Sequence, residues 1–164
     1  MSSAGVIAGP AEPGVRMVIS GQVFAPDGVT PVSDVIVYAY QTDDTGNYRN
    51  DARGVARLHG WAKTDASGRY ELRTIRPAPY PGRTIPAHVH FHLSGGGYPL
   101  QWTEELRFAD DPLVTRRDVD ASRARGKFGN VSVISRSEHG TQRATMNFRL
   151  LRETNYPPEA KPSP

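Results

Sequence analysis

The sequence predicts an all-β protein, an antiparallel β-sandwich with few or no helices. Its 16 glycines and 14 prolines among 164 residues exceed average usage, which favours short strands joined by many turns. Short apolar segments also recur at a regular spacing with turn residues between them, as they do in sandwich proteins. A chain of this length has the size of one ordinary domain and can bury a core of its own.

Eight segments are expected to be strands, because turn residues bound their apolar and β-branched residues. In chain order they are residues 17–24, 35–40, 58–63, 70–75, 87–93, 106–108, 130–135 and 144–151. The first strand ends at residues 25–28, where Pro26 presets φ and Gly28 tolerates a positive φ. Only residues 114–125 have a helical pattern, and their periodicity is poor.

The two ends of the chain differ in composition from the segment between them. Residues 1–16 are rich in alanine, glycine and proline, and residues 153–164 contain four prolines. Such ends are either disordered or wrap a partner subunit. We therefore expect a flexible N-terminal arm over residues 1–16, a sandwich domain over residues 17–152 and an extended tail over residues 153–164.

A short motif occurs twice. Residues 42–48 and 64–70 share the pattern T-D-x-x-G-x-Y, and each copy predicts a hairpin turn that opens a strand. The copies end at Tyr48 and Tyr70, and the pattern itself does not say which tyrosine has a chemical role. Residues 95–103, which include Trp102, are expected to form a loop that could cover a site.

Charge and cysteine content exclude several classes of partner and site. The net charge is only +3, from 20 basic and 17 acidic residues, and residues 116–127 form a mixed rather than a basic run, so nucleic acid is not the expected partner. Cysteine is absent, so a metal must use His, Tyr or carboxylate ligands, and this fits a reducing cytoplasm. Residues 1–16 lack the charged start and apolar stretch of a secretion signal, so we expect a cytoplasmic protein without a membrane partner.

The most informative segment is residues 79–92, which places histidines two residues apart on an expected strand. Side chains at i and i+2 share a face, so His88 and His90 point the same way, roughly 6.6 Å apart along the strand. Tyr80 lies between two prolines eight residues earlier, and a phenolate is a ligand that hard, oxidised iron favours. The segment therefore predicts redox chemistry on a metal. His92 shares the same face and is a candidate hydrogen-bond partner or acid/base group.

An ordered set of motifs resembles the intradiol ring-cleavage dioxygenases, in particular a protocatechuate 3,4-dioxygenase-type subunit. The motifs are residues 21–23, 31–32, the Gly-x-Tyr at Tyr48, residues 64–70, 74–77, the Pro-Tyr-Pro at Tyr80 and residues 86–91. The similarity spans about residues 17–115 and continues through residues 106–113 into the last strands. Catechol dioxygenases of the same superfamily carry an additional N-terminal helical part, for which this chain has no room.

The resemblance implies a non-haem Fe(III) ion held by two tyrosinates and two histidines, which match Tyr48, Tyr80, His88 and His90. It also implies that a catechol-like substrate binds as a dianion, with the Tyr80 phenolate accepting one of its protons. O2 would then open the ring between the two hydroxylated carbons and give a muconate-type product. Relatives assemble into larger complexes, so a homo-oligomer is expected, possibly with a second related subunit.

Two positions depart from the family pattern. Many members have an arginine three residues before the first histidine, where this chain has Ile85, so we hypothesise that Arg83 reaches the same pocket as a catalytic cation. Glu105 lies near a position where relatives carry glutamine, and its charge would disfavour an anionic substituent on the ring. The expected substrate is therefore an uncharged catechol.

Two other functions compete with this interpretation. Transthyretin-like sandwich domains that bind ligands without catalysis use the same T-D-x-x-G-x-Y turn, but they have no reason to contain residues 86–91. A zinc hydrolase could use the same cage, yet zinc sites usually take His, Cys or carboxylate ligands rather than a pair of phenolates.

Overall fold

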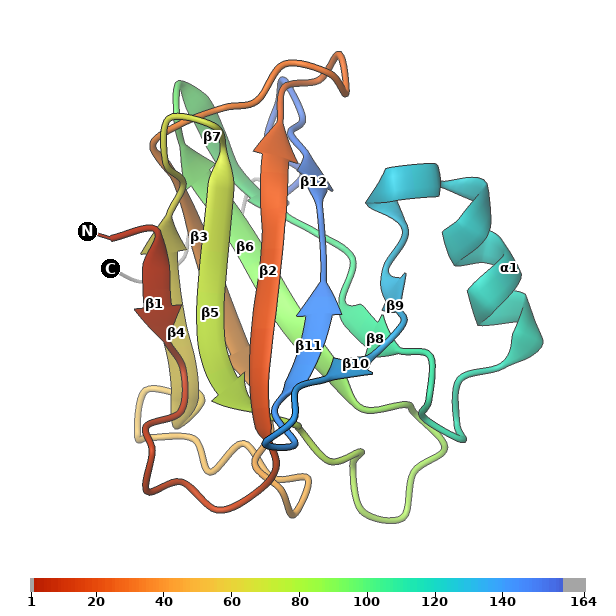
Figure 1. Cartoon of the computed structure of the whole chain (residues 1–164). Helices are drawn as coiled ribbons and strands as arrows, with labels where there is room; N and C mark the ends of the chain where they lie inside the picture. The colour runs from red at the N-terminus through yellow and green to blue at the C-terminus, as the bar shows by residue number, and fades with distance from the viewer. Residues whose placement is uncertain (1, 158–164) are drawn as a thin grey trace.

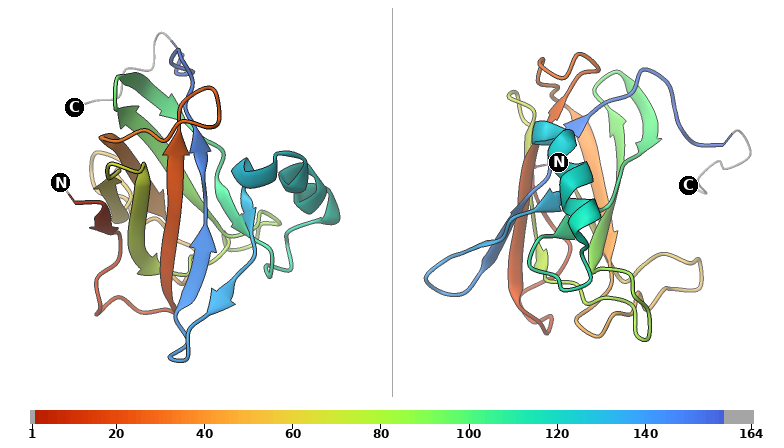
Figure 2. Two further views of the ribbon diagram at one scale, coloured as in Figure 1. Left: turned by 45° about the horizontal axis from the view of Figure 1, so that its top comes forward. Right: turned by 90° about the vertical axis from the view of Figure 1, so that its right-hand side faces the viewer.

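A computed structural model describes residues 2–157 and shows two sheets packed face to face, with one helix at the side (Figures 1 and 2). The first sheet contains β1 (Ala4–Val6), β5 (Arg69–Ile75), β2 (Arg16–Phe24), β11 (Gln142–Thr145) and β10 (Ser135–Arg136) in that order, with β12 (Phe148–Arg149) also paired to β2. The second sheet contains β4 (Leu58–Lys63), β3 (Val35–Gln41), β6 (His88–Gly95), β8 (Leu106–Phe108) and β9 (Val131–Ser132), with β7 (Tyr98–Trp102) paired to β6. The predicted β-sandwich is confirmed.

Both sheets are mixed rather than purely antiparallel. The pairs β1 with β5, β11 and β12 with β2, and β8 with β9 are parallel, while the other pairs are antiparallel. Each of the eight expected segments contains strand residues. The expected helical segment contains α1 (Arg116–Ala124), which is capped by Thr115 and Asp118 and followed by the short η1 (Gly126–Phe128). With nine residues, α1 is too short to cross a membrane, and residues 2–157 contain no other α-helix.

The core lies between the two sheets, and it sets which side chains face outward. On β3, Val35, Val37 and Ala39 are buried between the sheets, so the residues between them face away from the core. On β6 the buried apolar positions are 89, 91 and 93. The three histidines of β6 therefore lie on the outer face of the second sheet, as the two-residue period predicts.

The N-terminal residues do not form the expected flexible arm. Residues 4–6 form β1, which pairs with β5, and Ile7 and Ala8 are buried in the core. A Cβ on Gly5 would lie 2.2 Å from the carbonyl oxygen of Trp61, and one on Gly60 would lie 2.3 Å from that of Val6. The small residues that suggested flexibility instead allow two backbones to approach closely at one edge of the sandwich.

Two other expectations about loops need correction. The T-D-x-x-G-x-Y turn at residues 64–70 links β4 to β5, which belong to different sheets, and the copy at 42–48 leads into a long loop before β4, so neither forms a hairpin. Residues 95–103 contain the strand β7, because glycines 95–97 adopt positive φ values that turn the chain back along β6. Of the expected tail, residues 153–157 lie alongside β7, to which Thr154 and Asn155 are hydrogen-bonded. Residues 158–164 lie outside the described residues.

Candidate metal centre

Four side chains converge at one end of β6. The hydroxyl of Tyr48 lies 2.5 Å from that of Tyr80, which lies 3.0 Å from Nε2 of His88. Nε2 of His88 lies 3.1 Å from Nε2 of His90, which in turn lies 3.0 Å from the Tyr48 hydroxyl. These four atoms form a closed ring, which we call the donor cluster. The structure thus brings together residues that are spread over 43 positions of the sequence, from 48 to 90.

The two tyrosines are held by loops that pack against each other. The backbone N–H of Ala78 donates to the Asp43 carbonyl, and the Thr42 hydroxyl donates to the carbonyl of Ala78. Gly46 has a φ of 83°, and a Cβ at this position would lie 2.2 Å from the carbonyl oxygen of Pro79. Only glycine allows this approach, so the turn that carries Tyr48 can lie directly against the segment that carries Tyr80.

Hydrogen bonds on the far side of each imidazole set how the histidines face the cluster. Nδ1 of His88 lies 2.7 Å from the Pro86 carbonyl, to which it can only donate, so Nε2 presents its lone pair to the cluster. Nδ1 of His90 lies 3.8 Å from a carboxylate oxygen of Glu105. Burial, and to a lesser extent His88, lowers the pKa of His90 to about 4, so this imidazole is neutral at pH 7, as a metal ligand must be.

A chain of ion pairs connects His90 to α1. Arg107 donates to Glu105 at 2.8 Å and to Asp118 at 2.9 Å. Burial raises the pKa of Glu105, but the Arg107 hydrogen bond and the nearby imidazoles outweigh burial and lower it overall. Glu105 is therefore a carboxylate whose orientation is fixed by Arg107. A carboxylate oxygen of Glu105 and one ring nitrogen each of His88 and His90 lie within 4.8 Å of one another, so Glu105 is an alternative ligand to a phenol.

The spacing and the donor atoms of the cluster are better explained by a site for a hard metal ion than by hydrogen bonds alone. Adjacent ligands at right angles on a metal at about 2.1 Å lie about 3 Å apart, close to the separations found here. Burial and the Tyr80 hydrogen bond raise the pKa of Tyr48, so without a cation this phenol stays protonated. Two phenol oxygens and two imidazole nitrogens are a donor set suited to oxidised iron.

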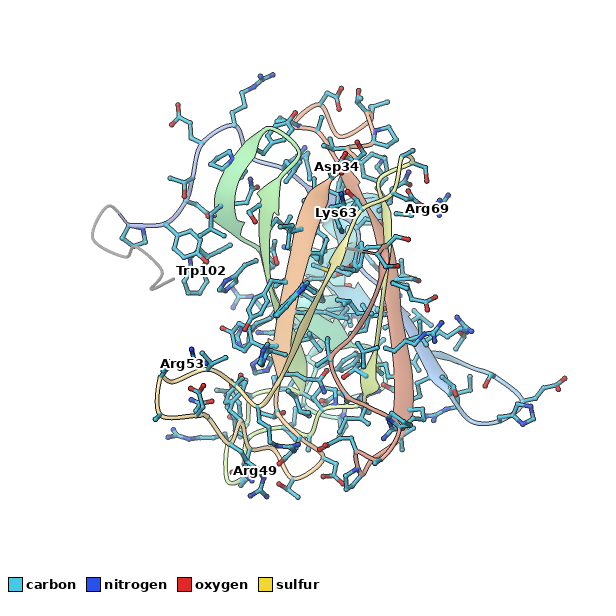
Figure 3. The ribbon with its side chains drawn as sticks, turned by 90° about the vertical axis from the view of Figure 1, so that its left-hand side faces the viewer. Asp34, Arg49, Arg53, Lys63, Arg69 and Trp102 are labelled. Carbon is cyan, nitrogen blue, oxygen red and sulfur yellow. The ribbon has the colours of Figure 1, made fainter. Side chains whose placement is uncertain are left out.

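A cavity of about 460 Å³ opens beside the donor cluster. Its lining side chains are aromatic, small or amide, and within residues 2–157 none of them is charged. They belong to Tyr38, Tyr40, Tyr48, Asn50, Gly54, Val55, Ala56, Tyr80, His90 and His92. Figure 3 shows the loop that forms one side, with Arg53 near its tip, on the same side of the molecule as Trp102. The cavity has the size of a small-molecule site.

The three further candidates take different positions. Glu105 contacts His90 from outside the cluster, and His92 lines the cavity. The ring of His92 accepts or donates a hydrogen bond at Nδ1 with the Tyr156 hydroxyl at 2.9 Å, while its buried Nε2 has no partner among the described residues. Arg83 lies in the exposed turn 81–85 and does not line the cavity, so its catalytic role stays a prediction.

Sequence reasoning missed several residues of the site. Tyr38 and Tyr40 line the cavity from β3, and the alternation of that strand carried the signal, because Val37 and Ala39 face the core. Arg107 and Asp118 position Glu105 through contacts between β8 and α1. No local pattern in the sequence pointed to these two residues.

Comparisons with known proteins agree with this geometry. A family profile described as "Dioxygenase" matches residues 4–151. The protocatechuate 3,4-dioxygenase beta chain of Burkholderia cepacia is 32% identical over 113 residues, covering 62% of this chain and 48% of the relative. The 6-chlorohydroxyquinol 1,2-dioxygenase of Cupriavidus pinatubonensis (strain JMP 134 / LMG 1197) is 31% identical over 159 residues, covering 84% and 54%. The chain spans about half the length of the curated relatives it matches.

Solved structures are similar as well. The dioxygenase domain of a dioxygenase carbohydrate-binding protein fusion from Streptomyces sp. SirexAA-E has a TM-score of 0.65 and 29% identity, covering 88% of this chain and 85% of that one. Catechol 1,2-dioxygenase from Pseudomonas arvilla C-1 has a TM-score of 0.69 and 23% identity, covering 99% and 60%, a likeness that shows the fold alone. Because the family profile matches most of the chain, this protein belongs to the intradiol dioxygenase family.

Proposed function

We propose that this protein is a non-haem Fe(III) intradiol dioxygenase. It would insert O2 into a catechol-like aromatic and cleave the ring between the two hydroxylated carbons to a muconate-type product. The observation that carries this proposal is the donor cluster, in which two phenols and two imidazoles face one another at 2.5–3.1 Å beside an uncharged cavity. Membership of the family, which implies non-haem iron, supports it.

The donor cluster would hold the iron through Tyr48, Tyr80, His88 and His90. When bound, Fe(III) would accept both catechol oxygens and draw electron density from the ring, so that O2 can attack it. The imidazole of His88 would stay fixed, because its Nδ1–H is bound to the Pro86 carbonyl. The imidazole of His90 would be kept in place by Glu105 and by the ring of Tyr40, which stacks on it at 4.7 Å and 15°.

Tyr80 and Tyr48 would have different tasks during the reaction. Residues 81–85 after Tyr80 are exposed, so this phenol can move toward solvent without disturbing the core. Tyr48 follows a turn that is pinned by hydrogen bonds from Thr45 and Asn47 to Asp43, and its own backbone carbonyl accepts a hydrogen bond from the Arg57 N–H. We therefore assign to the Tyr80 hydroxyl oxygen the task of leaving the centre and taking one substrate proton, while Tyr48 remains in place.

The substrate would be an uncharged catechol. None of the cavity-lining side chains within residues 2–157 offers a positive charge to an anionic substituent, and the Glu105 carboxylate lies just behind His90. Arg83 could act as a catalytic cation only by folding from its exposed turn over the cavity. An Arg83→Ala protein that binds iron and cleaves catechol at the full rate would refute that role.

The test of the function is the fate of labelled oxygen. The purified, iron-containing protein is mixed with catechol and ¹⁸O2, and the product is identified by mass spectrometry. We expect uptake of one O2 per catechol and a cis,cis-muconate that carries both labelled atoms. A product opened outside the two hydroxylated carbons, or no O2 uptake by protein with iron bound, would overturn the proposal. A colourless protein that takes up no iron would favour the non-catalytic binding module.

We also propose that the protein assembles into a homo-oligomer, with or without a second related subunit, and acts in the cytoplasm. The relative from Burkholderia cepacia is described as a beta chain, which supports an assembly. Light scattering of the purified protein and fractionation of the native cells test these two statements. A monomer at micromolar concentration would contradict the proposed oligomer. Recovery of the protein outside the cytoplasmic fraction would contradict the proposed location.

A further inference from the structure

A continuous row of aromatic side chains crosses the outer face of the second sheet. It consists of Trp61 on β4, Tyr38 on β3, His92 on β6 and Trp102 on β7, and we call it the aromatic row. Tyr38 is the register partner of both Trp61 and His92, and His92 is the partner of Trp102. Neighbouring ring centres lie 6.2, 5.7 and 4.9 Å apart in this order. These are the separations of interacting aromatic pairs.

Both ends of the aromatic row are open to solvent. Trp61 is 46% exposed and Trp102 is 45% exposed, and these are the two tryptophans of the chain. Figure 3 shows Trp102 projecting outward at the edge of this face. Tryptophan is enriched at binding surfaces, so two exposed tryptophans joined by a row of rings make this face a candidate binding surface.

The aromatic row is continuous with the proposed iron site. Tyr38 and His92, its two middle members, line the same cavity as His90 and the two tyrosines of the donor cluster. Tyr40 connects the two regions, because its ring stacks on His90 at 4.7 Å and lies 6.0 Å from the ring of Tyr38. Along β6 the row lies two residues from His90, about 6.6 Å by the rise of a strand.

This spacing suits a second aromatic ring on the substrate. An aryl group joined to a catechol directly or through a short link is long enough to reach from the donor cluster to the aromatic row. The rings of Trp61 and Tyr38 offer flat, uncharged faces to such a group, while the ring of Tyr156 lies 5.8 Å from that of His92 and 5.0 Å from that of Trp102 at the other end of the row. We propose that the aromatic row is a subsite for a second ring, and that the preferred substrates are uncharged catechols that carry an aryl substituent. This inference rests on the proposed ring-cleaving function.

Two other occupants fit the row less well. A sugar would need several free hydrogen-bonding groups, and part of those beside the row are already paired: Nδ1 of His59 with the Ala56 carbonyl, Asn155 with the backbone of Trp102, and the Tyr156 hydroxyl with His92. A second copy of the chain would need about 800 Å² on each partner, whereas two half-exposed tryptophans offer about 200 Å².

Tryptophan fluorescence tests the subsite without relying on activity, because both tryptophans belong to the row. The as-purified, iron-containing protein is titrated without O2 with biphenyl-4-ol, phenol and cellobiose. We expect biphenyl-4-ol to quench the emission at concentrations about tenfold lower than phenol, and cellobiose to have no effect. Equal quenching by the two phenols, or quenching by cellobiose, would overturn the proposal.

Substrate kinetics separate the subsite from the ring-cleaving function. Trp61→Ala and Trp102→Ala are compared with Val133→Ala, a control at an exposed position outside the site. We expect each tryptophan variant to raise KM for 4-phenylcatechol about tenfold more than KM for catechol. Equal effects on the two substrates overturn the subsite but leave the function intact, whereas an iron-bound parent that cleaves neither substrate overturns the function. Loss of an oligomer in the tryptophan variants, seen by light scattering, would show that a second copy covers the row and would also overturn the subsite.

Discussion

The two copies of the T-D-x-x-G-x-Y turn have the same backbone design but deliver their tyrosines to different places. In each copy one carboxylate oxygen, of Asp43 or of Asp65, accepts two backbone N–H groups and a hydroxyl. Tyr70 then enters a strand, where its buried hydroxyl donates to the carbonyl of Met146 at 2.7 Å. Tyr48 enters a loop, and its hydroxyl lies within hydrogen-bond distance of Tyr80 and His90 in the donor cluster. The motif fixes the turn, and the surroundings of each turn fix the role of its tyrosine.

The largest expected effect comes from exchanging each tyrosine for phenylalanine. Tyr48→Phe removes one proposed ligand, so we expect ring cleavage to fall at least about 100-fold, beyond the usual loss for a group that only supports a ligand. Tyr70→Phe removes a buried hydrogen bond instead and should cost about 1–2 kcal/mol of unfolding free energy with iron content unchanged. Metal analysis, steady-state rates and chemical denaturation distinguish the two. A Tyr70→Phe protein that loses iron while Tyr48→Phe keeps it would reverse the assignment.

The glycines of the two turns offer a second comparison. Gly46 and Gly68 both have positive φ. Backbone strain alone should therefore lower the free energy of unfolding by about 1–2 kcal/mol when either is replaced by alanine, and any steric clash would add to this. A Cβ at Gly46 meets Pro79, next to Tyr80, whereas one at Gly68 meets the carbonyl of Val23. We therefore expect both variants to lower the melting temperature, but only Gly46→Ala to weaken iron binding as well. Equal iron affinity in the two variants would contradict the close packing of the two tyrosine loops.

The smallest effect concerns the pH dependence of the two aspartates. Burial raises the pKa of Asp43, but hydrogen bonds from Thr45 and Arg49 outweigh burial and lower it overall. A lowered carboxyl pKa stabilises the fold above the unfolded value of about 3.9, and this contribution is lost as the pH falls below that value. Asp43→Asn should therefore lower the free energy of unfolding by about 1 kcal/mol at pH 7, with the difference from the parent shrinking below about pH 4.

Asp65→Asn is the matched control for this effect. The pKa of Asp65 is also lowered, by hydrogen bonds from Arg69 and Ser67, but its carboxylate is fully exposed, so the same substitution should have a smaller effect. Urea denaturation of both variants at pH 3, 5 and 7 measures the difference. A pH-independent loss in Asp43→Asn would show that its charge does not contribute.

The sequence was most informative where local geometry decides the outcome. The two-residue period of a strand placed His88 and His90 on one face, and the proline pair around Tyr80 indicated an ordered turn near them. Which tyrosine of the repeat reaches the cluster could be predicted only from the resemblance, because both turns have the same local chemistry. The β-sandwich followed from the spacing of short strands and turns.

Features that depend on distant contacts were missed. The N-terminal strand is rich in small residues and has no apolar alternation, yet it is ordered because Gly5 and Gly60 let it approach β4. The aromatic row depends on the register of four strands, which the sequence does not give directly. The pairing of Arg107 with Asp118 depends on the position of α1 against the sheet.

The most direct test of the donor cluster is the iron content and visible spectrum of the purified parent beside Tyr48→Phe and Tyr70→Phe. We expect one iron per chain and a red-brown charge-transfer band in the parent, a similar band in Tyr70→Phe, and a weakened or shifted band in Tyr48→Phe. A parent that stays colourless after iron loading, or a band that disappears in Tyr70→Phe and persists unaltered in Tyr48→Phe, would contradict this expectation.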